Sequence, residues 1–283
     1  MTPSTRVNRP ARWRCATVAG LAAAIVAATV LLVAAPERPD VPVIVARSVE
    51  AMRADWTAAP DYEYTERDTD EDGHTKTWDV LMIEGSPYYR LTAEDGQPLD
   101  AARAAREQRK LDQVTAARQR ESAAARAQRI RKYDTSRQHD HFLIEQMASA
   151  FDFAYEGERE VDGREVYELK ATPRAGYQPP EAEAKALTGM EGTLWIDTET
   201  FQWVKVTAHV VRSVSIYGFL ARVNPGTEFL LEQRPVGDGV WMPSRFRMQS
   251  RSTILFFIPH RTQDDEAYFD YRRVPAASGA RGR

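Results

Sequence analysis

From residue 151 onward the sequence alternates strand-like segments with tight turns, and this alternation constrains the fold more than any other feature. Residues 151–161 and 165–172 are joined by Asp162-Gly163, a dipeptide that strongly favours a two-residue hairpin. Further segments of the same kind lie at residues 193–197, 202–212, 227–234, 240–251, 254–258 and 265–273. Strands that follow one another through tight turns predict an up-and-down antiparallel sheet.

The part of the chain before residue 99 has one helix and then more strands. Apolar residues recur at helical spacing over residues 43–56, and Pro60 ends this pattern. Beyond Pro60 the pattern changes to alternation over residues 62–66, 77–83 and 88–93. We therefore expect an amphipathic helix that leads into an antiparallel meander.

A helical segment over residues 99–150 interrupts this meander. It contains neither Gly nor Pro and is dense in Ala, Arg, Gln and Glu, so it favours helix almost throughout. Its apolar positions form only a narrow stripe. Two interpretations stay open: a solvated helical insertion, or a mobile lid or partner-docking element that opens easily because it is weakly packed.

Together these segments predict a mainly β fold with helices, in one domain over residues 43–274. A sheet of about ten strands is large enough to curl. The only cysteine is Cys15, so this domain has no internal disulfide, and burial and backbone pairing must hold it together. We expect a monomer, with a proline-rich linker at residues 36–42 and a disordered tail at residues 275–283.

The first 35 residues carry a signal for export. Arg6, Arg9, Arg12 and Arg14 precede an uncharged, alanine-rich run over residues 16–35. About 20 apolar residues are also enough to span a bilayer as a helix. A cleaved signal peptide and an uncleaved N-terminal anchor therefore both fit, and both place the rest of the chain in the periplasm. In the second case, this run tethers the domain to the inner membrane.

The sequence shows no constellation of catalytic residues. It lacks a Gly-rich phosphate loop, an H-E-x-x-H motif, a G-x-S-x-G motif and a cysteine nucleophile, so we do not expect an enzyme. On a helix His139 and His141 point about 200° apart, which suits a metal poorly, and the acidic run at residues 68–72 fits a solvated hairpin loop. We expect no metal or other cofactor. The formal charge of −3 gives no general attraction to nucleic acid.

Apolar side chains at alternate strand positions are abundant, and they are the candidate ligand-binding residues. They are Leu194, Ile196, Val204, Val206, Phe229, Leu231, Phe246 and Met248. If the sheet is flat, these residues form a core against the first helix. A curled sheet with little helical cover instead leaves part of its concave face open as an apolar groove.

Three stretches of the chain carry a resemblance to a known superfamily. They are the strand Tyr62-Glu63-Tyr64-Thr65, the hairpin that ends Gly85-Ser86-Pro87-Tyr88-Tyr89-Arg90-Leu91, and Gly192-Thr193-Leu194-Trp195-Ile196-Asp197 before Trp203-Val204-Lys205-Val206. With the order of the elements, they resemble the LolA/LolB/RseB-like superfamily of periplasmic lipoprotein carriers and their relatives. The resemblance implies an unclosed antiparallel β-barrel around an apolar cavity, lidded by helices, with acyl chains as the ligand.

The same resemblance assigns a role to one arginine. Tyr89 and Arg90 match an aromatic-arginine pair of the carriers, which implies that Arg90 bonds to backbone carbonyls of the lid and holds it closed. Leu91 stands where the carriers have a tryptophan.

Two functions follow from the resemblance. In the first, the protein binds a lipid or the acyl chains of a lipoprotein and moves or presents them. In the alternative, it is an RseB-like envelope-stress sensor that binds an inner-membrane regulatory partner. Sensors of this kind carry a second small domain after the half-barrel, and no break in composition marks one here. We therefore expect the carrier type.

Overall fold

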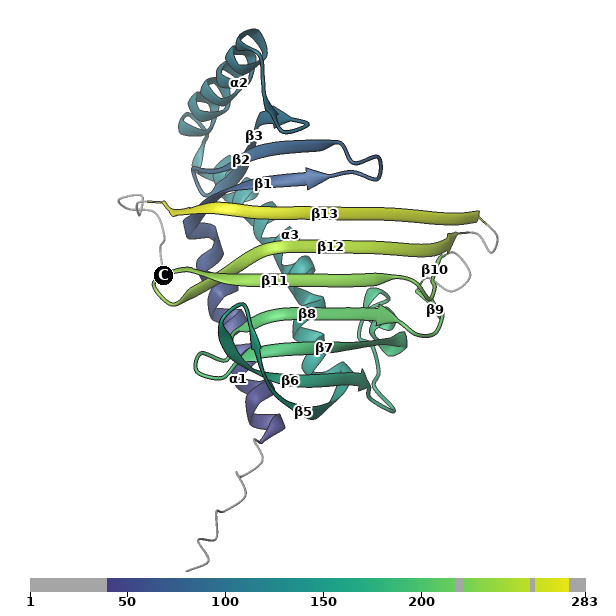
Figure 1. Ribbon diagram of the computed structural model, residues 1–283. Coiled ribbons are helices and arrows are strands. Elements are labelled where there is room, and N and C mark those ends of the chain that lie inside the picture. The colour runs from purple at the N-terminus through teal and green to yellow at the C-terminus, as the bar shows by residue number, and fades with distance from the viewer. Residues whose placement is uncertain (1–39, 217–220, 255–257, 275–283) are drawn as a thin grey trace, which may run out of the picture. The chain divides into compact units, whose positions relative to one another are not determined.

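The computed structural model describes residues 40–216, 221–254 and 258–274, all of which belong to one compact unit (Figure 1). Cys15, the apolar run at residues 16–35, residues 255–257 of one expected strand and the tail at residues 275–283 lie outside the described residues. Within the described part, no helix is long and apolar enough to cross a membrane.

The expected first helix is α1, Val41–Ala58. The Asp40 side chain caps it, because Oδ1 accepts a hydrogen bond from the Val43 N–H at 3.4 Å. The helix turns one face toward the sheet, and the buried residues of that face are Ile44, Val45, Ser48, Met52 and Asp55. A short 3-10 turn, Ala59–Asp61, contains Pro60 and ends the helix where the sequence predicts.

Thirteen strands form one antiparallel sheet within the described residues. The long strands are β1 Tyr62–Thr69, β2 Thr75–Ile83, β3 Ser86–Glu94, β5 Phe151–Val161, β6 Arg164–Pro173, β7 Met190–Asp197, β8 Trp203–Val210, β11 Glu228–Gly237, β12 Val240–Ile254 and β13 Ile258–Arg273. Three short strands were not expected: β4 Gln97–Pro98, β9 Val214–Ser215 and β10 Ala221–Val223. Two or three residues are too few to show the alternation from which a strand is predicted.

The strand order is β4-β3-β2-β1-β13-β12-β11-β8-β7-β6-β5, and off this path β10 pairs with β12 and β9 with β10 (Figure 1). The up-and-down expectation is right within each half of the sheet and wrong at their junction, where β1 pairs with the last strand, β13. As a result β4 and β5 lie at opposite edges of the sheet, and no described strand pairs with their outer sides. The barrel is therefore unclosed, as the resemblance implies.

The helical segment is divided into α2, Ala101–Gln119, and α3, Ala123–Ala150. The division occurs at Ser122, whose Oγ accepts from the Ala125 N–H at 3.2 Å and so starts a second helix. Composition predicts helix almost throughout this segment and does not mark the division. α3 has 28 residues, about 42 Å of helix, and leads the chain to the β5 edge of the sheet, on the same side as α1 (Figure 1).

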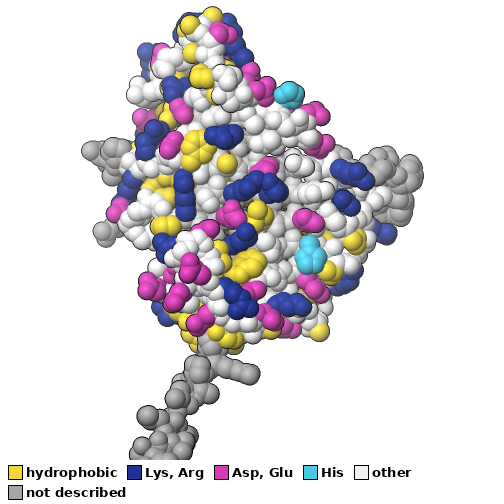
Figure 2. Space-filling view, viewed as in Figure 1, with side chains coloured by type: hydrophobic (Ala, Val, Ile, Leu, Met, Phe, Trp, Pro, Cys, Tyr) yellow, Lys and Arg dark blue, Asp and Glu magenta, His cyan; other side chains and the backbone are white. Residues whose placement is uncertain are grey.

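The sheet has two faces with different side chains. We call the side against which α1 and α3 lie the helix-covered face; its main apolar cluster joins residues of both helices to strands β5–β8 and β11. The opposite face carries interspersed cationic and anionic side chains (Figure 2). Cross-strand ion pairs on that face include Lys205–Glu232 at 2.9 Å and Arg245–Asp265 at 3.0 Å. On strands β5–β12, burial against the helices on one face and charged side chains on the other explain much of the alternation in the sequence.

Candidate functional site

One row of directly paired residues crosses the helix-covered face from β6 to β1. Its members are, in order, Leu169, Leu194, Val206, Leu231, Phe246, Glu266 and Asp68. The first five are apolar and the last two are acidic, with the change between β12 and β13. We call the β5–β12 side of this face the apolar half, and the side formed by β13, β1, β2 and β3 the acidic half.

Four of the candidate residues meet in the core of the apolar half. Leu194, Ile196, Val206 and Leu231 are 2%, 0%, 1% and 7% exposed and belong to one cluster. Because they are so fully covered, a ligand reaches them only if a helix moves.

Three further candidate residues line the border with the acidic half. Phe229 pairs with Met248 across the strands and is half-buried against the same cluster. Phe246 lies edge-on to Phe229, with ring centroids 5.5 Å apart. Val204 is placed elsewhere: it packs with Val166 and Trp241 in a separate buried cluster, apart from the other seven. A strand irregularity opposite Trp195 and Ile196 accompanies this change, and such irregularities are not visible in an alternating pattern.

Two helices cover the apolar half. Ile44, Val45 and Met52 of α1 are buried in its cluster, and Phe142, Ile144 and Met147 of α3 pack against it half-buried. The face that the sequence leaves open is therefore filled by α1 and the last turns of α3. For these strand residues the arrangement is the core alternative, with α3 as well as α1 forming the cover.

A groove of about 560 Å³ opens beside this cover, between α1, the end of α3 and β5. Its lining is mostly apolar, with Val41, Val45 and Val49 of α1 facing Ala148 and Phe153. Two ion pairs lie at its rim: Arg53 with Glu145 at 3.5 Å and Arg174 with Asp152 at 2.8 Å. The groove is not among the sequence-based expectations. Val41, Val45 and Val49, spaced four residues apart, nevertheless indicate one face of a helix.

A buried carboxylate fastens α1 to the sheet. Asp55 is 5% exposed, and its Oδ1 accepts from the Trp241 backbone N–H at 3.0 Å. Burial raises the pKa of Asp55 to about 6, although Trp241 and Gln202 favour the ionised form. Ionisation near neutral pH therefore costs the folded protein free energy through desolvation, while the hydrogen bond from Trp241 is kept. The other carboxylate oxygen of Asp55 has no partner among the described residues.

The acidic half contains three carboxylates close together. Glu66 pairs with Tyr268 and Asp68 with Glu266 across β1 and β13. Burial raises the pKa of Glu66 to about 8, helped by the charges of Asp68 and Glu266. Burial also raises the pKa of Glu266, which accepts a hydrogen bond from the Tyr268 hydroxyl. Asp68 accepts from the Trp78 indole N–H at 3.1 Å.

Aromatic rings enclose these carboxylates. The Tyr64 ring lies 5.2 Å from that of Tyr271 and 5.9 Å from that of Tyr268, centroid to centroid. Burial raises the pKa of all three tyrosines, so they are neutral hydrogen-bonding groups. Alternation over residues 62–66 places Tyr64 and Glu66 on one face of the strand, but it does not predict that the carboxylate points inward. A period of two tells which residues share a face, but not which face is covered.

Arg90 does reach the helical segment. Its Nη1 donates to the Gln108 side chain on α2 at 3.0 Å, and its Nη2 pairs with Asp79 on β2. The structure thus shows a contact with a side chain where the resemblance implies backbone carbonyls. That Arg90 holds a lid closed stays a prediction.

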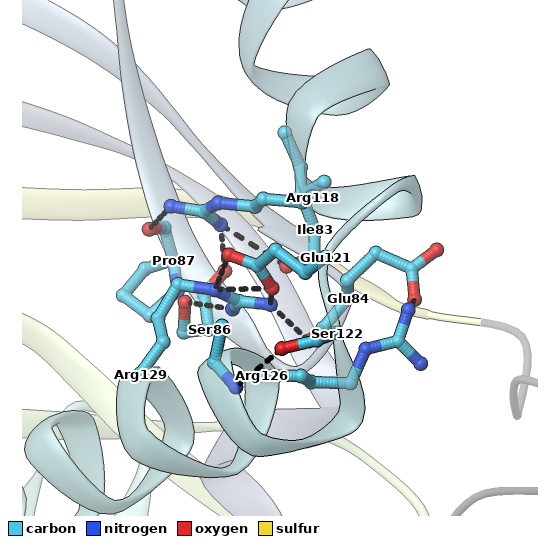
Figure 3. Close-up of polar contacts among 10 residues, drawn as sticks. Ile83, Glu84, Ser86, Pro87, Arg118, Glu121, Ser122, Arg126 and Arg129 are labelled. Carbon is cyan, nitrogen blue, oxygen red and sulfur yellow. Dashed lines mark hydrogen bonds and ion pairs between the residues drawn. The ribbon is translucent and has the colours of Figure 1, made fainter.

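Bonds to backbone carbonyls are made instead in the opposite direction, from the helices to the β2–β3 hairpin (Figure 3). Arg118 at the end of α2 donates to the carbonyls of Ile83, Ser86 and Pro87 at 3.0, 2.7 and 3.1 Å. Arg129 on α3 donates to the Glu84 carbonyl at 3.1 Å and is paired with Glu121 at 2.7 Å. The α2–α3 junction is therefore fixed to the hairpin through charged hydrogen bonds.

The metal candidates of the sequence take other roles. His141 is buried and stacks on Trp56 with ring centroids 5.2 Å apart, and burial lowers its pKa. Asp70 accepts from the backbone N–H groups of Asp72 and His74 and so builds its own turn. Across the described residues, no group of three His, Cys, Asp or Glu side chains has the geometry to hold a metal ion.

No protein-family model matches the chain, and no curated protein matches it. Solved structures do. A LolA superfamily protein from Nitrosomonas europaea matches at 12% identity and a TM-score of 0.30, covering 83% of this chain and 93% of its own. A putative outer membrane lipoprotein-sorting protein domain from Vibrio parahaemolyticus matches at 9% identity and a TM-score of 0.28, over 83% and 95% of the two chains.

The complex of MucA and MucB from Pseudomonas aeruginosa also matches, at 12% identity and a TM-score of 0.21, over 81% of this chain and 99% of that one. The names LolA superfamily and lipoprotein-sorting are those of the superfamily that the sequence resembles.

Proposed function

We propose that this domain binds an acyl chain in the groove beside α1, as a lipid- or lipoprotein-binding protein of the carrier type. The observation that supports this most is the groove itself, about 560 Å³ in volume, with a mostly apolar lining of valines, alanines, a proline and a phenylalanine and four charged residues, Glu50, Arg53, Asp152 and Arg174. Its volume is within the range of ligand pockets, about 300–1,000 Å³. Each methylene group that leaves water for such a lining contributes about 0.8 kcal/mol to binding.

The groove continues into the apolar half through a residue that belongs to both. Val45 lines the groove and is also part of the buried cluster that contains Leu194 and Leu231. A small displacement of α1 therefore extends the groove into the core, where the candidate strand residues become the wall of a deeper cavity. Those strand residues are proposed as ligand contacts in this displaced arrangement.

The alternative, an envelope-stress sensor with an inner-membrane partner, has no comparable observation in its favour. The export signal of residues 6–35 is compatible with either function, and in both cases we propose that the domain works in the periplasm. We therefore propose the acyl chain as the partner, because the described residues form a mostly apolar groove for it beside α1.

Two valines on α1 give a matched test. Val49 lines the groove, whereas Val43 is 49% exposed on the same helix and outside the groove. Val49→Asp places a carboxylate against the acyl chain, and Val43→Asp makes the same chemical change in water. The measurement is a titration of the full chain with a fluorescent fatty acid. We expect wild-type protein and Val43→Asp to bind alike and Val49→Asp to bind about tenfold more weakly or not at all.

Either of two results contradicts the proposal. One is the absence of saturable probe binding by the wild-type chain. The other is an equal loss in both variants, which shows that the probe does not distinguish the groove from the exposed side of the helix. Far-ultraviolet circular dichroism confirms that both variants fold.

A further inference from the structure

The helical segment differs in charge from the rest of the chain. Residues 99–150 contain eleven Arg and Lys against seven Asp and Glu, a formal charge of +4, whereas the whole chain carries −3. The remaining residues are therefore acidic on balance. A basic element on an acidic protein is attracted to anionic partners that the rest of the protein repels.

The cations of α2 and of its C-cap residue, Arg120, fall into three groups: two arginines face the sheet, Lys110 pairs with Glu107 at 2.6 Å, and three arginines are exposed. Arg103 and Arg118 turn toward the sheet, where Arg103 pairs with Glu94 at 2.6 Å and Arg118 binds the hairpin. Arg106, Arg109 and Arg120 are exposed, and no ion pair within the described part of the chain involves them. At 100° per residue, these three fall within about 60° of one another around the helix axis.

The stripe of α2 that contains them has a simple composition. Its members are Ala102, Arg106, Arg109, Gln113, Ala117 and Arg120, all exposed. The acidic residues of α2, Glu107 and Asp112, lie outside this stripe by about 60° or more. The stripe is therefore a narrow cationic surface with small side chains between the arginines.

We propose that this stripe docks α2 on the surface of an anionic phospholipid bilayer. Charge complementarity supports this occupant, because clustered arginines on a helix bind anionic headgroups. The stripe lacks the aromatic or large apolar side chains that anchor a protein interface, which disfavours an acidic protein partner. The stripe is also free to dock, since contacts on the opposite side of α2 hold the helix to β3. Docking goes beyond acyl-chain binding and does not depend on it.

The test uses the full chain in lipid nanodiscs of two compositions, phosphatidylcholine alone and phosphatidylcholine mixed with phosphatidylglycerol. The readout is hydrogen exchange of the α2 amides, residues 101–119. We expect exchange in α2 to be several-fold slower in the anionic discs at low salt, and this difference to disappear at about 1 M salt, where screening acts within about 3 Å. Attachment through residues 16–35 does not confound the comparison, because that run is present with both lipids.

Two double variants change the charge equally. Arg106→Glu with Arg109→Glu removes the stripe, whereas Arg222→Glu with Arg272→Glu alters exposed arginines of the sheet. We expect the first to lose the protection and the second to keep it; Arg106→Gln with Arg109→Gln serves as a neutral second test of the stripe. Equal exchange of wild-type α2 in both discs overturns the proposal. So does equal loss in both double variants, or protection by polyglutamate that anionic lipid does not produce.

Discussion

The two halves of the helix-covered face are built on the same strand pairing but hold opposite chemistry. In the apolar half, Leu194 and Leu231 pack against α1 with almost no exposed surface. One strand beyond Phe246, the same row continues with Glu266 and Asp68, enclosed by tyrosines. The difference shows that burial on this sheet serves two purposes: the apolar half stabilises the fold, and the acidic half keeps carboxylates where their ionisation costs free energy.

The largest effect is expected in the apolar half. Leu194→Ala leaves a cavity beneath α1 and should lower the free energy of unfolding by about 2–5 kcal/mol. Thr193→Ala, on the neighbouring residue that faces away from the helices, should cost less than about 1 kcal/mol. Urea unfolding measures both. Equal losses of unfolding free energy in the two variants would contradict this difference between the faces, because they would mean that the helix-covered face is not the core.

The next effect concerns the attachment of α1. Asp55→Ala leaves the Trp241 N–H without an acceptor in a buried place, which costs about 1–3 kcal/mol. Asp55→Asn keeps an acceptor oxygen and should cost less. Since the native pKa is raised from 3.8 to about 6, the native state binds more protons in this interval, and wild-type stability should fall as pH rises from about 4 to 6.

Asp55→Asn should remove this fall, which thermal unfolding at a series of pH values detects. If the asparagine variant keeps the same pH slope over this range, the attachment does not titrate and another group is responsible.

A smaller effect is expected where the helical segment meets the acidic half. Arg90→Leu removes the contacts with Asp79 and Gln108 and should cost about 1–2 kcal/mol. Arg118→Leu removes three carbonyl contacts and should speed hydrogen exchange in α2 more than Arg90→Leu does. If Arg90→Leu instead speeds hydrogen exchange in α2 more than Arg118→Leu does, the result supports the lid role that the resemblance assigns to Arg90.

The smallest effect is a gain in stability in the acidic half. With its pKa raised from 4.5 to about 8, Glu66 makes the native state less stable as pH rises between these values. Glu66→Gln should therefore stabilise the protein at pH 8–9, by about 1 kcal/mol once solvent screening is allowed for, and change little near pH 4. Chemical unfolding at the two pH values tests this, and a loss of stability at pH 9 contradicts it.

Much of the fold is predictable because the local signals are strong. The Asp162-Gly163 hairpin, the helix ending near Pro60 and most of the long strands lie where alternation and turn residues place them. The last strand differs, because β13 runs without a break from Ile258 to Arg273, whereas the expected strands are 254–258 and 265–273. The junction of β1 with β13 is not predictable in this way, since it joins residues about 200 positions apart and no local pattern encodes it. That junction brings Glu66 beside Tyr268 and creates the acidic half.

The site is only partly predictable for a related reason. Leu194, Ile196, Val206 and Leu231 do share one covered face, as alternation indicates. Val204 lies in the other cluster because the strand pairing is irregular beside it. The groove needs α1, α3 and β5 together, and residues 41–49 and 148–153 become neighbours only through the tertiary fold.

The central claim, that the apolar half and its groove hold an acyl chain, is tested most directly by native mass spectrometry of the full chain purified from cell envelopes. We predict a lipid adduct on the wild-type protein that is kept by Val43→Asp and lost by Val49→Asp, with the lipid identified after extraction. A wild-type chain without any adduct or extractable lipid, or an adduct that Val49→Asp retains in full, would contradict the claim.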